Sequence, residues 1–381
     1  MAVSGAAGFA AGWRTGFRSW RDRLLSDPRF QRWAAAFPLT RPIAQRRARD
    51  LFDICAGFVY SQVLFACVQC RLFDILREGP ISAGALAARL SMRVDATQRL
   101  LAAASSLRLV EPCGSTLYGL GPLGAAVAGN PGVAAMVQHH ALLYADLQDP
   151  MALLRGQARA TATSLFWPYA KTEGNVPPGI AAAYSRLMAV SQAMLADDVL
   201  AAYPVARHRC LLDVGGGDGS FLAAAAARLP HLQLMLFDLA PVIAVAERHL
   251  ARIGLADRAA TFGGDFRRDP LPVGADIVSL VRVLHDHDDE QAMVLLRAVR
   301  AALPPGGVLM IAEPMVDERR RDPVGDAYFG LYLLAMGSGR PRRPSEIREM
   351  LAAAGFSGTA ELPTRQPMLT RLVWGKVLDN R

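Results

Sequence analysis

The sequence predicts an α/β protein in which a helical N-terminal half precedes a mainly parallel β-sheet with helices on both faces. Two observations carry this prediction. Apolar residues recur at helical spacing over much of the first 205 residues, whereas from Cys210 onward short apolar runs alternate with helical segments. One apolar run ends at the glycine-rich stretch 211–220, which is typical of a strand that turns tightly into a helix. The 381 residues, 52% of them hydrophobic, suffice for two or three domains.

Charge and cysteine content bound the setting of the protein. Basic residues exceed acidic residues by 8, and the excess is almost all arginine, which codon usage alone can produce. Five cysteines in a long chain argue against a disulfide framework and favour a reducing compartment. The N-terminus lacks the basic start of a signal peptide. The longest apolar run, 54–70, falls short of the ~20 residues of a membrane span. We therefore expect a cytoplasmic protein, either soluble or peripheral to the inner or photosynthetic membrane.

The chain is expected to divide at residues 47, 135 and 205. Residues 1–47, here called the N-terminal arm, carry Trp13, Trp20 and Trp33 among many arginines. Aromatic rings combined with guanidinium groups are typical of a segment that lies at an anionic membrane surface. Nucleic-acid contact would use the same charges. A partly disordered arm, or one that packs on a partner subunit, explains the composition equally well.

Residues 48–135 predict a helical domain with the shape of a winged helix. An apolar helix over 54–76 is long enough to need burial on more than one side, which favours a homodimer interface. Shorter helices are expected at 81–90 and 95–107, the second with Asp95 as its N-cap, followed by a hairpin over 109–120.

A winged helix also raises DNA binding as a rival function. A recognition helix presents several polar or basic side chains to the bases, but the helix at 95–107 offers only Gln98 and Arg99. We therefore favour a structural, dimerising role and expect no nucleic-acid partner.

Residues 136–205 are again helical and are rich in methionine and aromatic residues, which suit the wall of a pocket for a large hydrophobic ligand. Ordinary core packing explains any single one of them better. The adjacent His139 and His140 are expected to point to different helix faces, so they do not predict a metal pair. The residues concerned are Met151, Phe166, Trp167, Tyr169, Tyr184, Met188 and Met194.

Residues 206–381 contain the predicted sheet. The glycine-rich turn has Gly215 and Gly217 in the first two places of a G-x-G-x-x-G dinucleotide fingerprint, but Ser220 occupies the third. Asp238 ends the second strand, where a carboxylate can accept hydrogen bonds from both hydroxyls of a ribose. The turn thus predicts a cofactor of the nucleoside type rather than NAD. Candidate strands are 210–214, 233–237, 260–262, 276–281, 307–312, 358–362 and 370–376.

More polar residues follow the next strands, and ligands of such sheets bind beyond the carboxyl ends of the strands. Asp265 could take the exocyclic amine of an adenine, and Phe266 could lie against its ring. His285 follows the fourth strand, and an imidazole with an ordinary pKa of ~6.5 can accept a proton at neutral pH. Glu313, one strand over, is expected to hold the other ring nitrogen. A loop histidine with no catalytic role is the alternative for His285, and His287 is expected in solvent.

Two further features surround His285. The run of His and Asp at 285–289 does not predict a metal site, because neighbouring ligands seldom converge on one ion. Asp288 and Gln291 predict the start of a helix over 289–302.

Five motifs in this order and spacing resemble the S-adenosylmethionine-dependent O-methyltransferases of the caffeate and hydroxyindole type. The resemblance implies a class I methyltransferase Rossmann-like sheet with an N-terminal helical, winged-helix-like dimerisation domain. It also implies S-adenosyl-L-methionine as the cofactor and no metal. The motifs are LLDVGGGDG at 211–219, FDLAPVI at 237–243, GGDF at 263–266, LHDHDD at 284–289 and AEP at 312–314.

The resemblance also implies roles for single residues. His285 matches the catalytic base and Glu313 the acid that orients it. The family has a second supporting Glu before an Arg-Thr pair, where this sequence has Pro341, and Asp286 is the candidate to compensate. His287 replaces the usual Trp of its motif. The implied cofactor-binding residues are Asp213, Gly215, Gly217, Asp238, Leu239, Asp265, Phe266 and Arg282.

The stretches 27–43 and 51–62 narrow the resemblance further. They are similar to the bacterial branch of the family that methylates the tertiary 1-hydroxyl of acyclic carotenoids in the spheroidene pathway. This implies a carotenoid acceptor, methylated by in-line displacement with His285 as the general base. A small phenolic acceptor is the competing enzyme function, and a DNA-binding regulator is the non-enzyme alternative.

Overall fold

The computed structural model describes residues 16–158, 160–166, 192, 195–318 and 322–378. The chain forms two compact units, residues 1–124 and 125–381, and each is described by itself. Of the pocket residues expected from the sequence, Trp167, Tyr169, Tyr184, Met188 and Met194 lie outside the described residues, as does Trp13 of the arm.

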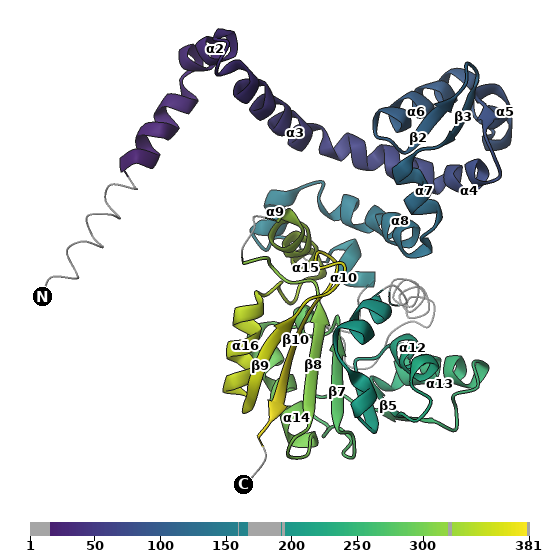
Figure 1. The fold of residues 1–381 in the computed structure, drawn as a ribbon, viewed down its shortest axis with the longest axis vertical. Helices are drawn as coiled ribbons and strands as arrows, with labels where there is room; N and C mark the ends of the chain where they lie inside the picture. Colours follow the sequence, from purple (N-terminus) through teal and green to yellow (C-terminus); the bar gives the residue numbers. More distant parts are fainter. Residues whose placement is uncertain (1–15, 159, 167–191, 193–194, 319–321, 379–381) are drawn as a thin grey trace, which may run out of the picture. The chain divides into compact units, whose positions relative to one another are not determined.

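The first unit begins with three helical segments (Figure 1). Residues 16–26 are helical and are followed by α2 (Pro28–Ala36) and by the 29-residue α3 (Arg41–Gln69). The prediction of one apolar helix over 54–76 is wrong at its end. Arg71 adopts a left-handed conformation with φ 56°, which interrupts the helical hydrogen bonds before α4 (Leu72–Arg77) begins.

Helix α3 carries an exposed apolar face within its own unit. By length and composition it could cross a membrane, and only 11% of its most apolar window is buried. The expectation that this apolar run is too short for a span does not hold by this criterion, because an 18-residue window of the helix is apolar enough. The core helix of a soluble protein passes the same test, and burial against a partner would satisfy this face as well. Its exposed side chains are Leu51, Phe52, Ile54, Phe58 and Val59.

The rest of this unit has the predicted helices and hairpin with shifted starts. Ile81 and Ser82 pair with the strand that contains Leu117, so the first short helix begins only after them. Ser82 caps this helix by accepting a hydrogen bond from the Ala85 amide. Asp95 is not the N-cap that the sequence predicts. Arg93 takes that position, and its guanidinium binds the Asp95 carboxylate at 2.5 Å. The elements are β1 (Ile81–Ser82), α5 (Ala83–Leu90), α6 (Val94–Ser106), β2 (Val110–Cys113) and β3 (Leu117–Leu120).

The second unit is built on a seven-stranded sheet in the order β6-β5-β4-β7-β8-β10-β9. The five strands from β6 to β8 are parallel, and β10 pairs antiparallel with both β8 and β9. This confirms the predicted α/β class, and each expected strand overlaps an observed one. The strands are β4 (Cys210–Val214), β5 (Gln233–Asp238), β6 (Ala259–Gly263), β7 (Ile277–Val281), β8 (Val308–Glu313), β9 (Phe356–Leu362) and β10 (Arg371–Val377).

Helices cover both faces of this sheet (Figure 1). Apolar residues of α12 (Ser220–Arg228) and α13 (Ala240–Arg252) pack in one core cluster, and those of α14 (Asp289–Ala302) and α16 (Pro344–Ala353) pack in the other. Every residue of β7 and β8 is buried, as expected of central parallel strands. The predicted helix over 289–302 is confirmed, with Asp288 accepting from the Gln291 amide.

The remaining helices of the second unit either precede β4 in the chain or follow β7 and β8. They are α8 (Pro131–Asp146), α9 (Pro150–Leu154), α10 (Ala162–Phe166), η2 (Val205–Arg207), η3 (Leu284–Asp286), η4 (Val324–Phe329) and α15 (Gly330–Met336), while α7 (Pro122–Ala128) crosses the boundary between the units.

Candidate active site

The glycine-rich turn between β4 and α12 brings bare backbone to the edge of the sheet. Gly215 and Gly217 have φ of 69° and 60°, a region that favours glycine. A Cβ at Gly215 would lie 2.8 Å from a methyl carbon of Val283, so a larger residue would clash there. The turn can therefore pass close to the end of β7 and present amides to a ligand.

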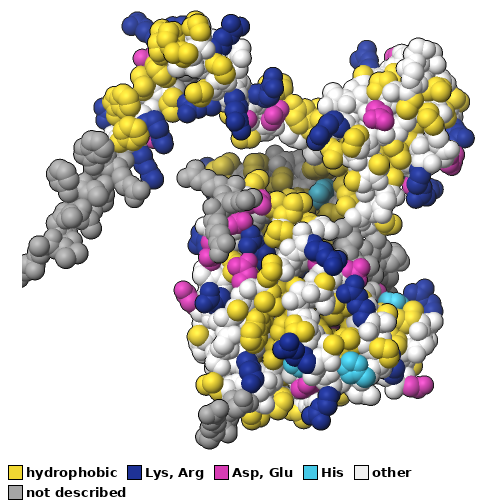
Figure 2. Space-filling model, in the orientation of Figure 1, with side chains coloured by type: hydrophobic (Ala, Val, Ile, Leu, Met, Phe, Trp, Pro, Cys, Tyr) yellow, Lys and Arg dark blue, Asp and Glu magenta, His cyan; other side chains and the backbone are white. Residues whose placement is uncertain are grey.

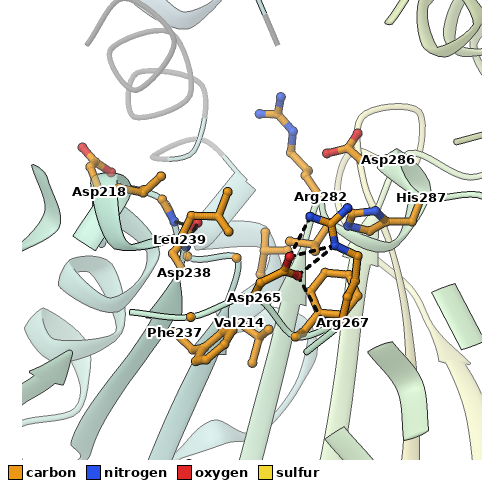
Figure 3. A pocket seen from close by; sticks show the side chains of 18 of the residues that line it. Val214, Asp218, Phe237, Asp238, Leu239, Asp265, Arg267, Arg282, Asp286 and His287 are labelled. Atoms are coloured by element: carbon orange, nitrogen blue, oxygen red, sulfur yellow. Dashed lines mark hydrogen bonds and ion pairs between the residues drawn. The ribbon is translucent and has the colours of Figure 1, made fainter. Parts of the chain in front are cut away.

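A cavity opens above this turn, at the carboxyl ends of β4, β5, β6 and β7 (Figure 3). The structure brings together seven of the eight residues that the sequence predicts for the cofactor. They come from four different strand ends, which is where ligands bind in open α/β sheets. The seven are Gly215, Gly217, Asp238, Leu239, Asp265, Phe266 and Arg282.

Asp238 lies on the wall of this cavity with its carboxylate held by backbone amides. It accepts hydrogen bonds from Gly217 at 2.9 Å and from Leu239 at 2.7 Å. Burial raises its pKa to about 6, and the two amides oppose that rise. The group is thus ionised at neutral pH, in a position where two hydroxyl donors of a ribose would satisfy its remaining lone pairs. The donor set fits a nucleoside.

Asp265 already has a cationic partner in this structure (Figure 3). Its two carboxylate oxygens accept from the Arg267 guanidinium at 2.7 to 3.0 Å, and this contact lowers the pKa of Asp265. A cofactor amine would have to share the carboxylate with Arg267.

His287 does not lie in solvent, contrary to the prediction. It lines the cavity and packs edge-on against Phe266, with ring centroids 5.1 Å apart. Burial, followed by the nearby Arg267, lowers the pKa of His287 to about 4. The tight turn of η3 brings residue 287 back toward the end of β6, which the local sequence does not reveal.

Asp213 is the predicted cofactor residue that does not line the cavity. It is buried under the glycine turn, where it accepts a hydrogen bond from the Ser279 hydroxyl at 2.6 Å. A Cβ at Gly216 would lie 2.6 Å from its carboxylate. Successive side chains of a strand point to opposite faces, so Val214 reaches the cavity and Asp213 supports the turn from beneath. Burial raises its pKa to about 7.

His285 sits in the buried turn η3 just after β7. Its Nε2 lies 3.2 Å from the Asp286 carboxylate, and its Nδ1 has no hydrogen-bond partner among the described residues. Burial, aided by Arg282 and Arg342, lowers the pKa of His285 to about 3, so the ring is neutral at pH 7. Burial raises the pKa of Asp286 well above its usual value. The ring therefore has one nitrogen engaged and one that is buried without a partner in the described residues, and His285 itself does not line the cavity at the glycine turn.

Glu313 does not hold the ring of His285, contrary to the prediction. Its Oε2 accepts from the backbone amide of His285 at 3.0 Å, while its Oε1 has no partner within the described part of the chain. The carboxylate ends β8, directly beside the start of η3, so the main chain of the turn lies nearer to it than the imidazole does. Asp286, proposed from the sequence to compensate for Pro341, is the acid that contacts the ring.

The segment 338–342 holds the turn that carries His285, and the sequence did not predict this. Arg342 is fully buried and also binds the Asp289 carboxylate at 2.8 Å. Gly339 is pressed against the turn so closely that a Cβ would meet the His285 carbonyl oxygen. All four carbonyls of 284–287 accept from this segment: Asp286 from Ser338 Oγ (3.0 Å), His285 from the Arg340 amide (3.0 Å), Leu284 from Arg342 Nη1 (2.9 Å) and His287 from Arg342 Nη2 (2.8 Å).

His139 and His140 reach the same neighbouring segment, contrary to the prediction. Their Nε2 atoms share hydrogen bonds of 2.7 Å with the hydroxyls of Tyr332 and Tyr328, which lie one turn apart. Adjacent helix positions differ by about 100°, which still allows both rings to face one broad surface. The Phe329 ring between these tyrosines lies 6.1 Å from the His285 ring. Within the described residues, no group of three or more metal-ligating side chains could hold a metal ion.

Two of the predicted pocket residues can be placed. The Phe166 ring lies 4.9 Å from the ring of His139, so it joins the aromatic cluster formed by the two histidines and the rings of residues 328, 329 and 332. Met151 is 49% exposed. This aromatic cluster contacts His285 through Phe329.

A seven-stranded sheet of this order, with a nucleoside-type cavity at a glycine turn, defines the class I methyltransferases. A family model of the O-methyltransferase domain matches residues 144–357, and a model of the O-methyltransferase dimerisation domain matches residues 52–129. The chain belongs to the O-methyltransferase family and is an enzyme that methylates a hydroxyl. The second match indicates a homodimer and favours dimerisation over the DNA-binding alternative.

Individual relatives cover most of the chain. Demethylspheroidene O-methyltransferase of Cereibacter sphaeroides is 43% identical over 92% of this chain and 93% of its own. Acetylserotonin O-methyltransferase of Mus musculus is 31% identical over 82% of this chain and 84% of its own. The crystal structure of human N-acetylserotonin methyltransferase in complex with SAM has a TM-score of 0.73 and 25% identity, over 87% of this chain and 98% of its own.

Proposed function

We propose that this enzyme methylates the tertiary 1-hydroxyl of an acyclic carotenoid, with S-adenosylmethionine as the methyl donor and His285 as the general base. The observation that carries the acceptor is the 43% identity with demethylspheroidene O-methyltransferase over nearly the whole of both chains. The acetylserotonin enzymes, which act on another kind of acceptor, reach 32% over a smaller share.

The cavity supports the choice of cofactor. S-adenosylmethionine would supply an electrophilic methyl on its sulfonium; in-line displacement would form the O–CH3 bond, break the S–CH3 bond and leave the sulfur as the neutral thioether of S-adenosylhomocysteine. Asp238 binds the ribose hydroxyls, and the amides of the glycine turn border the site. Phe266 offers a ring face for the adenine, and Asp265 offers a carboxylate that it shares with Arg267.

His285 removes the proton of the acceptor hydroxyl. Its ring is neutral, so a lone pair is available at physiological pH, and the unpartnered Nδ1 is the nitrogen that can accept. Asp286 contacts the opposite nitrogen and orients the ring. A tertiary alcohol is far less acidic than a phenol, so proton removal is concerted with methyl transfer. General base catalysis of this kind is worth ~10²- to 10⁴-fold in rate.

Labelled methyl transfer in detergent tests the acceptor. The purified enzyme is given S-adenosylmethionine with a labelled methyl and micelles that contain an acyclic 1-hydroxycarotenoid. The same carotenoid without the hydroxyl is the matched control, and a small phenol is the competing acceptor. Label that enters only the hydroxylated carotenoid supports the proposal. Efficient methylation of the phenol, with none of the carotenoid, would overturn it in favour of the phenolic alternative.

A further inference from the structure

We propose that the N-terminal arm binds an anionic lipid surface, which makes the enzyme a peripheral membrane protein. The proposal rests on the described part of the arm, residues 16–47, and does not depend on which acceptor is methylated. Three observations carry it: an exposed row of aromatic side chains, a surrounding set of arginines, and the position of the arm outside the dimerisation domain.

The aromatic side chains of the arm form two groups, and most of them are exposed. In the first helix, Phe17 and Trp20 are 56% and 59% exposed, with ring centroids 5.9 Å apart. At α2, the Trp33 ring lies 5.6 Å from Phe30 and stacks on Phe37 at 5.1 Å. Amphipathic aromatic rings on a helix face are what insertion at the headgroup level requires.

The α2 corner presents this row in a fixed form. The Thr40 hydroxyl donates to the Ala34 carbonyl at 2.8 Å, and the Phe37 amide donates to the Trp33 carbonyl at 2.9 Å. These contacts hold the turn between α2 and α3, so the stacked rings need little ordering when they bind. Leu39 and Ile43 extend the apolar surface beyond the turn and are 79% and 56% exposed.

Arginines surround these rings, as Figure 2 shows over α2. Residues 16–47 contain eight arginines but only two acidic residues, Asp22 and Asp27. In the first helix, Phe17, Trp20 and Leu24 fall on one helical face with arginines on both sides of it. The arginines are Arg18, Arg21, Arg23, Arg29, Arg32, Arg41, Arg46 and Arg47.

A lipid surface fits this arm better than a second copy of the chain does. The dimerisation-domain match begins at residue 52, after the arm, and covers most of the exposed face of α3. A self-complementary contact between two arms would bring two sets of positive charge together, whereas anionic headgroups neutralise them. Insertion of the rings would then bury the apolar row at the same time.

Vesicle binding by the purified full-length dimer tests the proposal. Flotation is measured with phosphatidylcholine vesicles, with and without phosphatidylglycerol, at low and high salt. We expect binding only to the anionic vesicles, weakened by salt, with a blue shift of tryptophan fluorescence. Replacing Arg18, Arg21 and Arg23 by glutamine should weaken binding on the order of 100-fold, since each basic residue near the surface contributes about 1 kcal/mol, roughly a fivefold factor.

Matched variants separate the arm from general charge and hydrophobicity. Arg248, Arg252 and Arg297, all exposed in the second unit, are replaced by glutamine as the charge control and should leave binding within about twofold of wild type. Trp20→Ala with Trp33→Ala should reduce the blue shift, whereas Phe262→Ala with Val273→Ala should not change it.

Three outcomes would overturn the proposal. Equal binding by the arm and control arginine variants would assign the effect to net charge. If the arm variants lose the dimer in sedimentation while their vesicle binding is unchanged, the arm is an element of the subunit interface. Protein that stays on the vesicles after an alkaline carbonate wash would point to a spanning α3 in place of a peripheral arm.

Discussion

His285 combines a buried neutral ring with one nitrogen that has no partner in the described structure. If that nitrogen takes the acceptor proton, His285→Gln should lower kcat by ~10²- to 10⁴-fold, because only the proton-transfer contribution is lost. Cofactor affinity by calorimetry should stay close to that of the wild type. His231→Gln, at an exposed position, is the control. A His285→Gln enzyme with near-normal kcat would remove His285 from the role of base.

The pH dependence follows from the two directions of pKa shift at the site. The imidazole of His285 loses its proton above about pH 3, so the base form is present throughout the neutral range. We expect kcat at saturating cofactor to stay nearly constant from about pH 8 down to about pH 5. The Asp238 carboxyl, with a pKa near 6, takes up a proton as the pH falls, so cofactor binding should weaken below that value. A fall in kcat centred near pH 6.5, the pKa of an ordinary histidine, would contradict a His285 base whose pKa is lowered by burial.

Asp238 is best tested by removing its charge while keeping its shape. Asp238→Asn retains an oxygen for the backbone amides of Gly217 and Leu239 but loses the ionised acceptor. Hydrogen bonds to charged groups are worth ~1.5 to 3 kcal/mol, so cofactor affinity should fall roughly 10- to 100-fold. Isothermal calorimetry measures the change, and exposed Asp257→Asn serves as the control. Unchanged affinity would count against ribose binding by Asp238.

At the scale of elements, the turn η3 owes its position to the segment 338–342. Arg342 bonds two of its carbonyls and the carboxylate of Asp289 from a fully buried position. A lysine cannot present the same fork of donors. Arg342→Lys should therefore leave a buried carbonyl unpaired and cost about 1 to 3 kcal/mol in the free energy of unfolding.

Activity should respond to Arg342→Lys as well, because a looser turn misplaces His285. We expect kcat to fall by a larger factor than the KM for cofactor rises, since the turn supplies only part of the cavity wall and Asp238 lies on another strand. The adjacent, largely exposed Arg343→Lys is the matched control and should have little effect on either quantity. Equal kcat in the two variants would show that the segment does not position the base.

Element boundaries were predictable where the signals are local. Asp288 starts α14 at the expected residue because a capping carboxylate acts over three positions of its own chain. The break between α3 and α4 at Arg71 was missed, since no glycine or proline marks it. In the segment 338–342 the sequence shows only that Pro341 stands where the family has a supporting Glu. Nothing in the neighbouring residues indicates that Arg342 is buried.

At the scale of the whole molecule, the apolar face of α3 is exposed, because no described residue of its own unit covers it. Most of this face lies within the matched dimerisation domain. Phe58→Asp places a charge on a side chain that is 71% exposed here, and it should shift the protein toward monomer in sedimentation equilibrium, because an unpaired charge is costly in an interface. Val273→Asp, 74% exposed in the other unit, should leave the dimer intact. A Phe58→Asp protein that remains dimeric would place the interface elsewhere.

The sequence by itself determined the class of the fold, the glycine turn and the acids at the strand ends. Apolar runs, glycines and their spacing are local signals, and parallel strands bring their carboxyl ends to one edge whatever the details. Only the tertiary structure decided which atoms meet there. Glu313 binds the main chain of η3, Asp286 contacts the ring, and Arg342 reaches Leu284 across 58 positions of sequence. Such pairings depend on how distant segments pack, which local propensity does not encode.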